Sequence, residues 1–313
     1  MAPDEGGNEG TDTPATDTPA TDAPATGPLW VRGQSSQART RRSRLAGDTT
    51  NRRIPNFNSP TDGAATTLRR QNVASTNPNS AQTRRLWMAL SPALIVPCLG
   101  ALAYFVLFTE SALVKTLYGS TKAFTVVWPV LALTLILRQR FQLPHPHRRD
   151  LDAIALGAAS GFLIGLVLVG LAQTALRGAV SSGVPAIRSQ AERFDLIDHY
   201  WQFALLLSVV HAFIEEYYWR WFVYGQLRRL LPPAGAHVVA GAAFAAHHVV
   251  ITGVYFGWGW GVVFGAGVGL GGVLWSIMYE RQGTLTGAWI SHAIVDLAIM
   301  AVGHRALWGT WIF

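Results

Sequence analysis

The sequence predicts an all-α membrane protein, a polytopic transmembrane helical bundle of about seven spans that follows a disordered N-terminal tail. Half of its 313 residues are hydrophobic and only 14% are charged, whereas about a quarter of the residues of a soluble globular domain are charged. The apolar residues gather in long runs after residue 85. Cys98 is the single cysteine, which excludes an intrachain disulfide, a four-cysteine zinc site and an iron–sulfur cluster. The composition therefore excludes a water-soluble enzyme, a collagen and a disulfide scaffold.

Residues 1–85 are predicted to be a disordered, basic tail on the cytoplasmic side of the membrane. Residues 11–25 repeat a five-residue unit, TDTPA twice and then TDAPA, and such polar, proline-containing repeats bury too little apolar surface to fold. Residues 28–85 contain 11 arginines and two acidic residues. An arm for nucleic acid or anionic lipid is one interpretation of this charge. We favour arginines that fix the membrane orientation, with no specific nucleic-acid partner, because no aromatic residues are interleaved for base stacking.

Residues 86–313 are predicted to be the transmembrane helical domain. A helix needs about 20 predominantly apolar residues to cross the hydrocarbon core. The first run has no formal charge, the second is short and contains a proline, and the third has an acid only at its edge. The fourth carries charges in its second half, and the last three are again apolar. The seven predicted spans cover residues 86–108, 123–137, 151–176, 200–224, 234–256, 257–279 and 284–303.

The sixth predicted span carries a glycine at every fourth position, at Gly257, Gly261, Gly265 and Gly269. Residues four apart lie on one side of a helix, and small residues there let a second helix approach closely. The pattern predicts a helix-packing face, with a ligand channel as the alternative.

The distribution of arginine and lysine in the short connections predicts the orientation. Positive charge is denser in the tail, in residues 138–149, at Arg228 and at Arg281 than on the opposite side, where Lys122 and the other flanking cations fall. Because cytoplasmic connections carry the excess of positive charge, the N-terminus is predicted to be cytoplasmic. The prediction requires that the short second span crosses the membrane. A bacterial plasma membrane is the preferred location of this multi-pass protein.

Ionisable side chains inside three of the predicted spans carry the functional argument. Such groups cost at least a few kcal/mol each in a bilayer, so they normally face a polar interior and have a task. All of them lie in the fourth, fifth and seventh spans, and none lies in the first three. They are Glu215, Glu216, Asp296, Arg220, His211, His247, His248 and His292.

Helical spacing assigns different neighbours to the two adjacent glutamates. Glu216 and Arg220 are four residues apart, so they share one face of a helix and can form an ion pair. Glu215 is rotated by about 100° from Glu216, which leaves it as a possible general base. His211 lies one turn from Glu215 and is able either to hydrogen-bond it or merely to line a cavity. A salt-bridge network that only holds helices together is the alternative interpretation.

Two further pairs with a spacing of four lie in the fifth and seventh spans. Phe244 and His248 share one face, so the neighbouring His247 is predicted to be a supporting or interface residue. His292 and Asp296 share a face of the seventh span, where the carboxylate can fix the tautomer of the imidazole or both groups can bind a metal. Three such pairs in three spans predict one polar site within the membrane.

The three motifs resemble those of a known family. Glu-Glu-x-x-x-Arg at 215–220, Phe-x-x-x-His at 244–248 and His-x-x-x-Asp at 292–296 are similar in order and setting to the CAAX-processing and bacteriocin-processing (CPBP) intramembrane peptidases. This family includes the type II CAAX prenyl endopeptidases. The resemblance covers residues 200–303, about a third of the chain. It implies an all-helical membrane fold with a polar cavity, and peptide-bond hydrolysis of a membrane-tethered protein or peptide within that cavity.

The resemblance also implies roles for individual residues. Glu215 would activate the attacking water with the help of His248, while Glu216 and Arg220 would hold the geometry of the site. His292 and the residue four positions after it would stabilise the oxyanion or position the water.

This sequence departs from the family at the last motif position, where the family often has asparagine and this chain has Asp296. An ionised aspartate only accepts hydrogen bonds, so we expect it to orient His292. The family has been described both as metallopeptidases and as glutamate peptidases. Glu215, His248 and His292 could bind one zinc ion with an open position for water, but no His-Glu-x-x-His motif is present. We favour the metal-independent mechanism with no cofactor.

Two other classes of function fit parts of the sequence. A non-catalytic membrane scaffold or regulator would have no need for an unpaired Glu215. A proton-coupled transporter could use the same acids and histidines as a relay, but the two halves show no inverted repeat and no matched pair of broken helices. The peptidase with a membrane-tethered substrate in the lipid bilayer is therefore the favoured hypothesis.

Overall fold

The computed structural model describes residues 78–109, 113–140 and 150–309. The described residues are almost entirely helical and none of them forms a strand, which confirms the predicted all-α fold. Most of the predicted tail, residues 1–77, lies outside the described residues. The α-helices and π-helical segments (η) follow in the order α3 (Pro78–Leu102), η1 (Ala103–Leu107), α4 (Val114–Leu131), η2 (Ala132–Ile136), α5 (Asp150–Gln173), α6 (Arg177–Arg193), α7 (Tyr200–Leu206), η3 (Leu207–His211), α8 (Ala212–Glu215), η4 (Glu216–Tyr224), α9 (Gly225–Leu227), α10 (Pro233–Phe256), α11 (Trp258–Gln282) and α12 (Thr286–Trp308).

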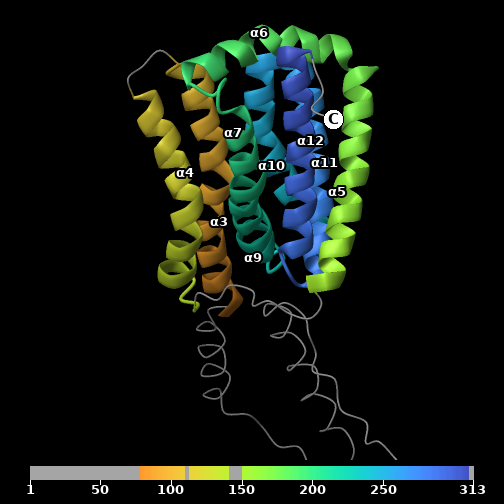
Figure 1. Cartoon of the computed structure of the whole chain (residues 1–313). Coiled ribbons are helices and arrows are strands. Elements are labelled where there is room, and N and C mark those ends of the chain that lie inside the picture. The colour runs from red at the N-terminus through yellow and green to blue at the C-terminus, as the bar shows by residue number, and fades with distance from the viewer. Residues whose placement is uncertain (1–77, 110–112, 141–149, 310–313) are drawn as a thin grey trace, which may run out of the picture.

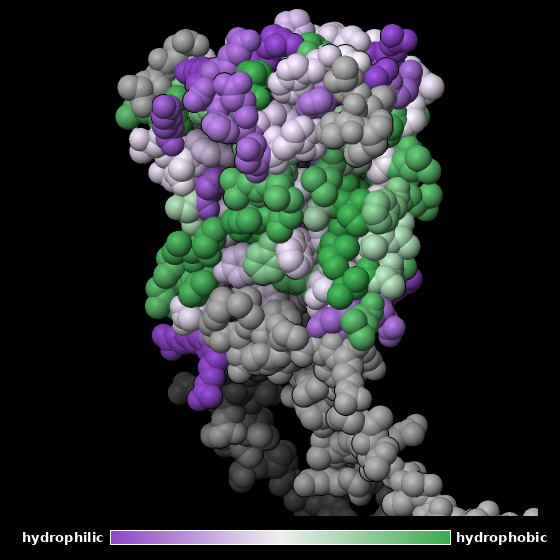
Figure 2. Space-filling model, viewed as in Figure 1, coloured by the Kyte–Doolittle hydropathy of each residue, from purple (hydrophilic) through white to green (hydrophobic). Residues whose placement is uncertain are grey.

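Six of the described helices are long and apolar enough to cross a membrane. They stand side by side as a bundle (Figure 1), and on the face seen in Figure 2 a band of hydrophobic side chains crosses the middle of the bundle between more hydrophilic ends. The second, which was predicted to be short, is a full 23-residue span because its helix begins at Val114. The six are Ser80–Leu107, Val114–Ile136, Asp150–Gln173, Pro233–Phe256, Trp258–Gln282 and Thr286–Trp308.

The remaining predicted span, 200–224, is also a continuous helical segment. It is built from α7, η3, α8 and η4, and α9 continues it to Leu227, so its hydrogen-bonding pattern alternates between α and π. It carries three charged residues close together and is not among the six. Wide π-helical turns are frequent at functional sites, and both glutamates of the first motif lie at the junction of α8 and η4.

A helix that the sequence analysis did not predict lies at one end of the bundle. α6 runs across the ends of the other helices rather than along them (Figure 1). Its sequence mixes polar and apolar residues, so it lacks the apolar run by which a span is found. The side chains at this end are largely hydrophilic (Figure 2).

The glycines of the sixth predicted span pack against α10, which confirms the predicted packing face. A Cβ atom added at Gly261 would lie 2.6 Å from the Cα atom of Gly253, and one at Gly269 would lie 2.9 Å from the Cβ atom of Ala245. Gly257 instead ends α10 with a φ of 83°, a value that L side chains rarely adopt. The close approach of α11 fixes the helix that carries both histidines of the second motif.

Candidate active site

The structure brings the three motifs to one place inside the bundle. Glu215 ends α8 and Glu216 begins η4, the two adjacent histidines lie in the middle of α10, and His292 and Asp296 lie on α12. Two tyrosines hold η4 against the first two spans. Tyr218 donates a hydrogen bond to the Ala93 carbonyl oxygen at 2.8 Å, and Tyr217 donates to the Val126 carbonyl oxygen at 3.1 Å.

Glu216 and Arg220 form a fully buried ion pair, which confirms the pairing predicted from their spacing. The Arg220 Nη1 atom lies 2.9 Å from Glu216 Oε1, and the two side chains are 1% and 0% exposed. The guanidinium also lies over the rings of Phe244 and Trp275, at 4.5 and 5.0 Å from their centroids. Ring faces attract a desolvated cation, so Arg220 is held by one carboxylate and two aromatic rings.

His292 is fixed by Glu216 and by an aromatic ring. Its Nδ1 atom donates a hydrogen bond to Glu216 Oε1 at 2.7 Å, and its ring stacks on Trp275 with centroids 4.0 Å apart. The Nε2 atom then points between Glu215 Oε2, at 3.7 Å, and Asp296 Oδ1, at 3.6 Å. The sequence analysis expected Asp296 to orient this imidazole, but the hydrogen bond that fixes the ring comes from Glu216.

The two carboxylate oxygens of Glu215 have different surroundings. Oε1 lies 3.2 Å from His211 Nε2 and 3.8 Å from His247 Nε2, while Oε2 faces His292. The carboxylate is nearly buried, and no arginine or lysine of the described residues lies within ion-pairing distance of it. Glu215 is thus a buried acid among histidines, whereas Glu216 is a buried acid beside an arginine.

The two histidines of α10 both lie beside Glu215. His248 donates its Nδ1 hydrogen to the Phe244 carbonyl oxygen at 2.9 Å, which leaves a lone pair on Nε2. His247, expected to be a supporting or interface residue, lies beside Glu215. Its ring stacks on Trp219 and its Nε2 atom points to Glu215. Spacing from Phe244 favoured one histidine, but ligand atoms of both lie within 4.8 Å of Glu215.

Glu215, His247 and His248 form a group that could bind a metal ion, since their ligand atoms all lie within 4.8 Å of one another. One carboxylate and two imidazoles are suitable zinc donors, and the Nδ1–H bond of His248 to a carbonyl oxygen is typical of a metal-binding histidine. Zinc bonds of about 2.0–2.2 Å would require the three ligands to approach one another. The group contains His247 where the sequence analysis expected His292, whose Nε2 atom lies 3.7 Å from the Oε2 atom of Glu215.

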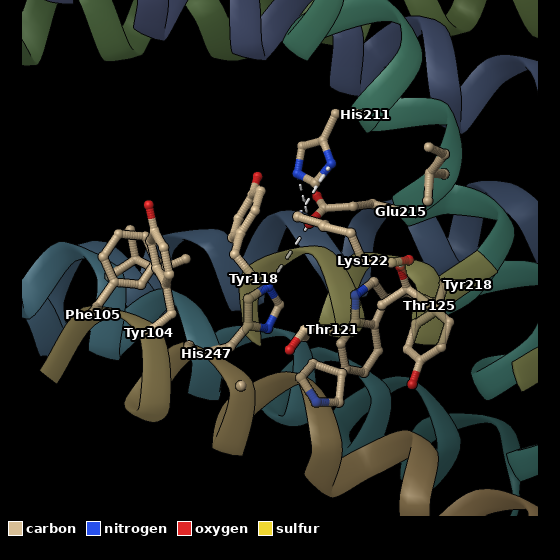
Figure 3. A pocket seen from close by; sticks show the side chains of 16 residues that line it. Tyr104, Phe105, Tyr118, Thr121, Lys122, Thr125, His211, Glu215, Tyr218 and His247 are labelled. Atoms are coloured by element: carbon tan, nitrogen blue, oxygen red, sulfur yellow. Dashed lines mark hydrogen bonds and ion pairs between the residues drawn. The ribbon is translucent and has the colours of Figure 1, made fainter. Parts of the chain in front are cut away.

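A cavity gives access to Glu215 from the side of α3 and α4 (Figure 3). Aromatic residues, among them Tyr104 and Tyr118, form one wall, and His211, Glu215 and His247 form the inner end. Lys122 also lines the cavity, with its Nζ atom 3.5 Å from His211 Nδ1.

Lys122 was missed because the sequence analysis placed it in the connection before the second span. The helix begins at Val114, nine residues before the predicted start of the span at residue 123. Lys122 therefore lies about two turns inside the helix. One signal could have identified Lys122. The predicted second span, 123–137, is shorter than the about 20 residues that a crossing needs, so the helix had to extend into the neighbouring residues, which include this lysine.

Comparison with known families agrees with this geometry. Residues 197–298 match the family model described as type II CAAX prenyl endopeptidase Rce1-like. The chain carries an Rce1-like domain. This domain spans a third of the 313 residues and includes every motif residue described above. The resemblance inferred from the three motifs is therefore confirmed.

Searches of curated proteins and of solved structures gave no match. The Rce1-like domain and the six apolar helices together identify the chain as an integral membrane protein. They also support an activity of the intramembrane CAAX-protease type.

Proposed function

We propose that the protein is an intramembrane endopeptidase that hydrolyses a peptide bond of a membrane-tethered protein or peptide. One observation carries the proposal: a buried glutamate, with no arginine or lysine of the described residues within ion-pairing distance, lies among histidines from three helices at the inner end of a cavity. A buried acid without such a pairing is costly. The cost is explained if Glu215 has a chemical task, and the Rce1-like domain indicates that the task is proteolysis.

In the proposed reaction Glu215 acts as the general base. It takes a proton from a water molecule while the water oxygen attacks the carbonyl carbon of the scissile peptide bond. His248 assists through its free Nε2 lone pair, which can accept a hydrogen bond from the same water. When the C–N bond of the tetrahedral intermediate breaks, the proton on Glu215 passes to the leaving amine. General base catalysis of this kind contributes about 10²–10⁴-fold.

The other motif residues have supporting roles in this proposal. Glu216 and Arg220 fix the position of His292 through the buried ion pair and the 2.7 Å hydrogen bond. His292 directs Nε2 toward Glu215 and stabilises the oxyanion or positions the water. Asp296, 3.6 Å from the same Nε2 atom, cannot donate to an oxyanion when ionised. We assign it to accepting the Nε2 hydrogen of His292 when that nitrogen is protonated.

A metallopeptidase is the second candidate, and the grouping of Glu215 with His247 and His248 favours it. These three residues would hold a zinc ion, which when bound supplies polarisation of the attacking water. Glu215 would then be a ligand, and the general base would have to be another residue. Elemental analysis of purified, active protein separates the two mechanisms, since a metallopeptidase contains about one metal ion per chain.

The proposed location is a bacterial plasma membrane with a cytoplasmic N-terminus. The dense arginines of residues 28–85 support this orientation, and so does the length of the helix Val114–Ile136, which is sufficient for a full crossing. The orientation is tested with cysteines introduced into the tail. Intact cells are treated with a thiol reagent that does not cross the membrane. A cytoplasmic tail is labelled only after the membrane is opened.

The proposed reaction is tested by incubating the protein in lipid vesicles with a library of lipid-anchored peptides in ¹⁸O-labelled water. Hydrolysis places ¹⁸O in the new C-terminal carboxylate of one product, which mass spectrometry detects. A scaffold or a transporter produces no labelled peptide above the level of empty vesicles, and that result would overturn the proposal. Proton-linked uptake into the same vesicles would instead support a transporter.

A further inference from the structure

Lys122 is a cation in an unusual place. The chain contains two lysines, Lys115 and Lys122, and both lie on α4. Seven residues are close to two helical turns, so the two side chains leave nearly the same face of the helix. Lys115 is exposed near the start of α4, whereas Lys122 is half-buried two turns deeper in the span. A charged side chain at such a depth is costly and normally has a task.

The contacts of Lys122 point to His211. Its Nζ atom lies 3.5 Å from His211 Nδ1 and 5.5 Å from the centroid of the Tyr118 ring. In the part of the chain that the structure describes, Lys122 forms no ion pair with a carboxylate. In Figure 3 its side chain lines the cavity beside Glu215 and His211.

This contact determines which nitrogen of His211 carries the hydrogen. An ammonium group has three N–H donors and no acceptor, so the Nδ1 atom of His211 must present its lone pair to Lys122. The single ring hydrogen of a neutral imidazole is then on Nε2. That atom lies 3.2 Å from Glu215 Oε1. The hydrogen bonds therefore run in one direction, from Lys122 to His211 and from His211 to Glu215.

We propose that Lys122 is a positioning residue: it fixes the tautomer of His211, and His211 in turn holds one carboxylate oxygen of Glu215. Oε1 is occupied as the acceptor of the His211 hydrogen. Oε2, which faces His292 at 3.7 Å, remains available to the water. This inference rests on the proposed role of Glu215 as general base, and it specifies which of its oxygens takes the proton.

The arrangement can be tested without any substrate. Protein labelled with ¹⁵N-histidine and held in lipid gives nitrogen resonances that distinguish protonated from unprotonated ring nitrogens, and a His211→Gln variant assigns those of His211. We expect a protonated Nε2 and an unprotonated Nδ1 in the wild type. Lys122→Met should mix the two tautomers, Lys122→Arg should preserve the wild-type signals, and the matched control Lys115→Met should not change them. A protonated Nδ1 in the wild type would overturn the proposal even if no variant could be purified.

Kinetics test the consequence for hydrolysis. Loss of a residue that orients a catalytic group costs about 10–100-fold, so we expect Lys122→Met to lower kcat by that factor while KM changes little. Lys122→Arg should recover most of the lost kcat, since arginine also only donates. An effect of Lys122→Met confined to KM would overturn the proposal and assign Lys122 to binding the substrate. If the wild type hydrolyses no peptide, the proposed function fails, while the nitrogen spectra still decide whether Lys122 fixes His211.

Discussion

The buried pair of Glu216 and Arg220 allows a prediction about stability that can be worked from the structure. Both side chains are essentially inaccessible to solvent, and the pair supports His292 through a hydrogen bond of 2.7 Å. Replacing Arg220 by methionine leaves a buried carboxylate without its cation. Breaking a buried pair from one side costs about 3–5 kcal/mol. The loss of the contacts of Arg220 with Phe244 and Trp275 adds to this cost.

The partner substitution and the double variant test whether the cost arises from an unpaired charge. Glu216→Gln retains the shape of the side chain and leaves the guanidinium unpaired, so it should also destabilise the protein. The variant with both Glu216→Gln and Arg220→Met has no buried charge. It should be more stable than the sum of the two single effects predicts, by about 2 kcal/mol, a coupling within the range seen for residues in contact.

These free energies are measured by equilibrium unfolding in mixed micelles with increasing sodium dodecyl sulfate. The fluorescence of the 12 tryptophans follows the unfolding. Arg84→Met is the matched control, because Arg84 is exposed on α3, and it should change the free energy of unfolding by less than about 0.5 kcal/mol. A cost of Arg220→Met below about 1 kcal/mol, or strict additivity in the double variant, would show that the pair does not stabilise the site in this way.

Three further predictions follow from single contacts. Gly261→Ala should lower the free energy of unfolding by about 1–3 kcal/mol, because the added Cβ atom would lie 2.6 Å from the Gly253 Cα atom. Gly267→Ala is the control: Gly267 lies on the open side of α11, so this variant should have no such effect in the same unfolding assay. His248→Ala should lower kcat by about 10²–10⁴-fold in a peptide-cleavage assay if the imidazole assists the general base, and wild-type turnover would exclude that role. Trp275→Phe, which removes the donor to Ser291 Oγ at 3.1 Å, should destabilise the protein by about 1 kcal/mol in the unfolding assay, and an unchanged midpoint would contradict the contact.

The sequence allowed prediction of those features that follow from the cost of charge in lipid and from helical spacing. Intramembrane acids and histidines were identified because any ionisable group in an apolar run is exceptional. The pairing of Glu216 with Arg220 followed because α and π turns both keep residues four apart near one another. The glycines of α11 predicted close packing because their spacing places them on one side of a helix.

Other features depended on information that local patterns lack. The position of His247 beside Glu215 depends on how α10 packs in the bundle, which the local sequence pattern does not contain. α6 has no apolar run, because it lies across the ends of the spans. Lys122 was assigned to a connection because the apolar run begins only after it, although the helix already starts at Val114. The contact between Lys122 and His211 joins residues 89 positions apart and could be found only in three dimensions.

The central claim is that the Glu215 carboxylate takes the proton from the attacking water. Its most direct test is the single-turnover rate of peptide cleavage by Glu215→Gln protein in lipid vesicles. Glu280→Gln is the matched control, because Glu280 pairs with Arg228 and His237 away from the cavity. With equal insertion and the same unfolding midpoint, Glu215→Gln should cleave at least about 10³-fold more slowly than the wild type, while Glu280→Gln stays within a few-fold of it. Cleavage by Glu215→Gln at the wild-type rate would contradict the claim.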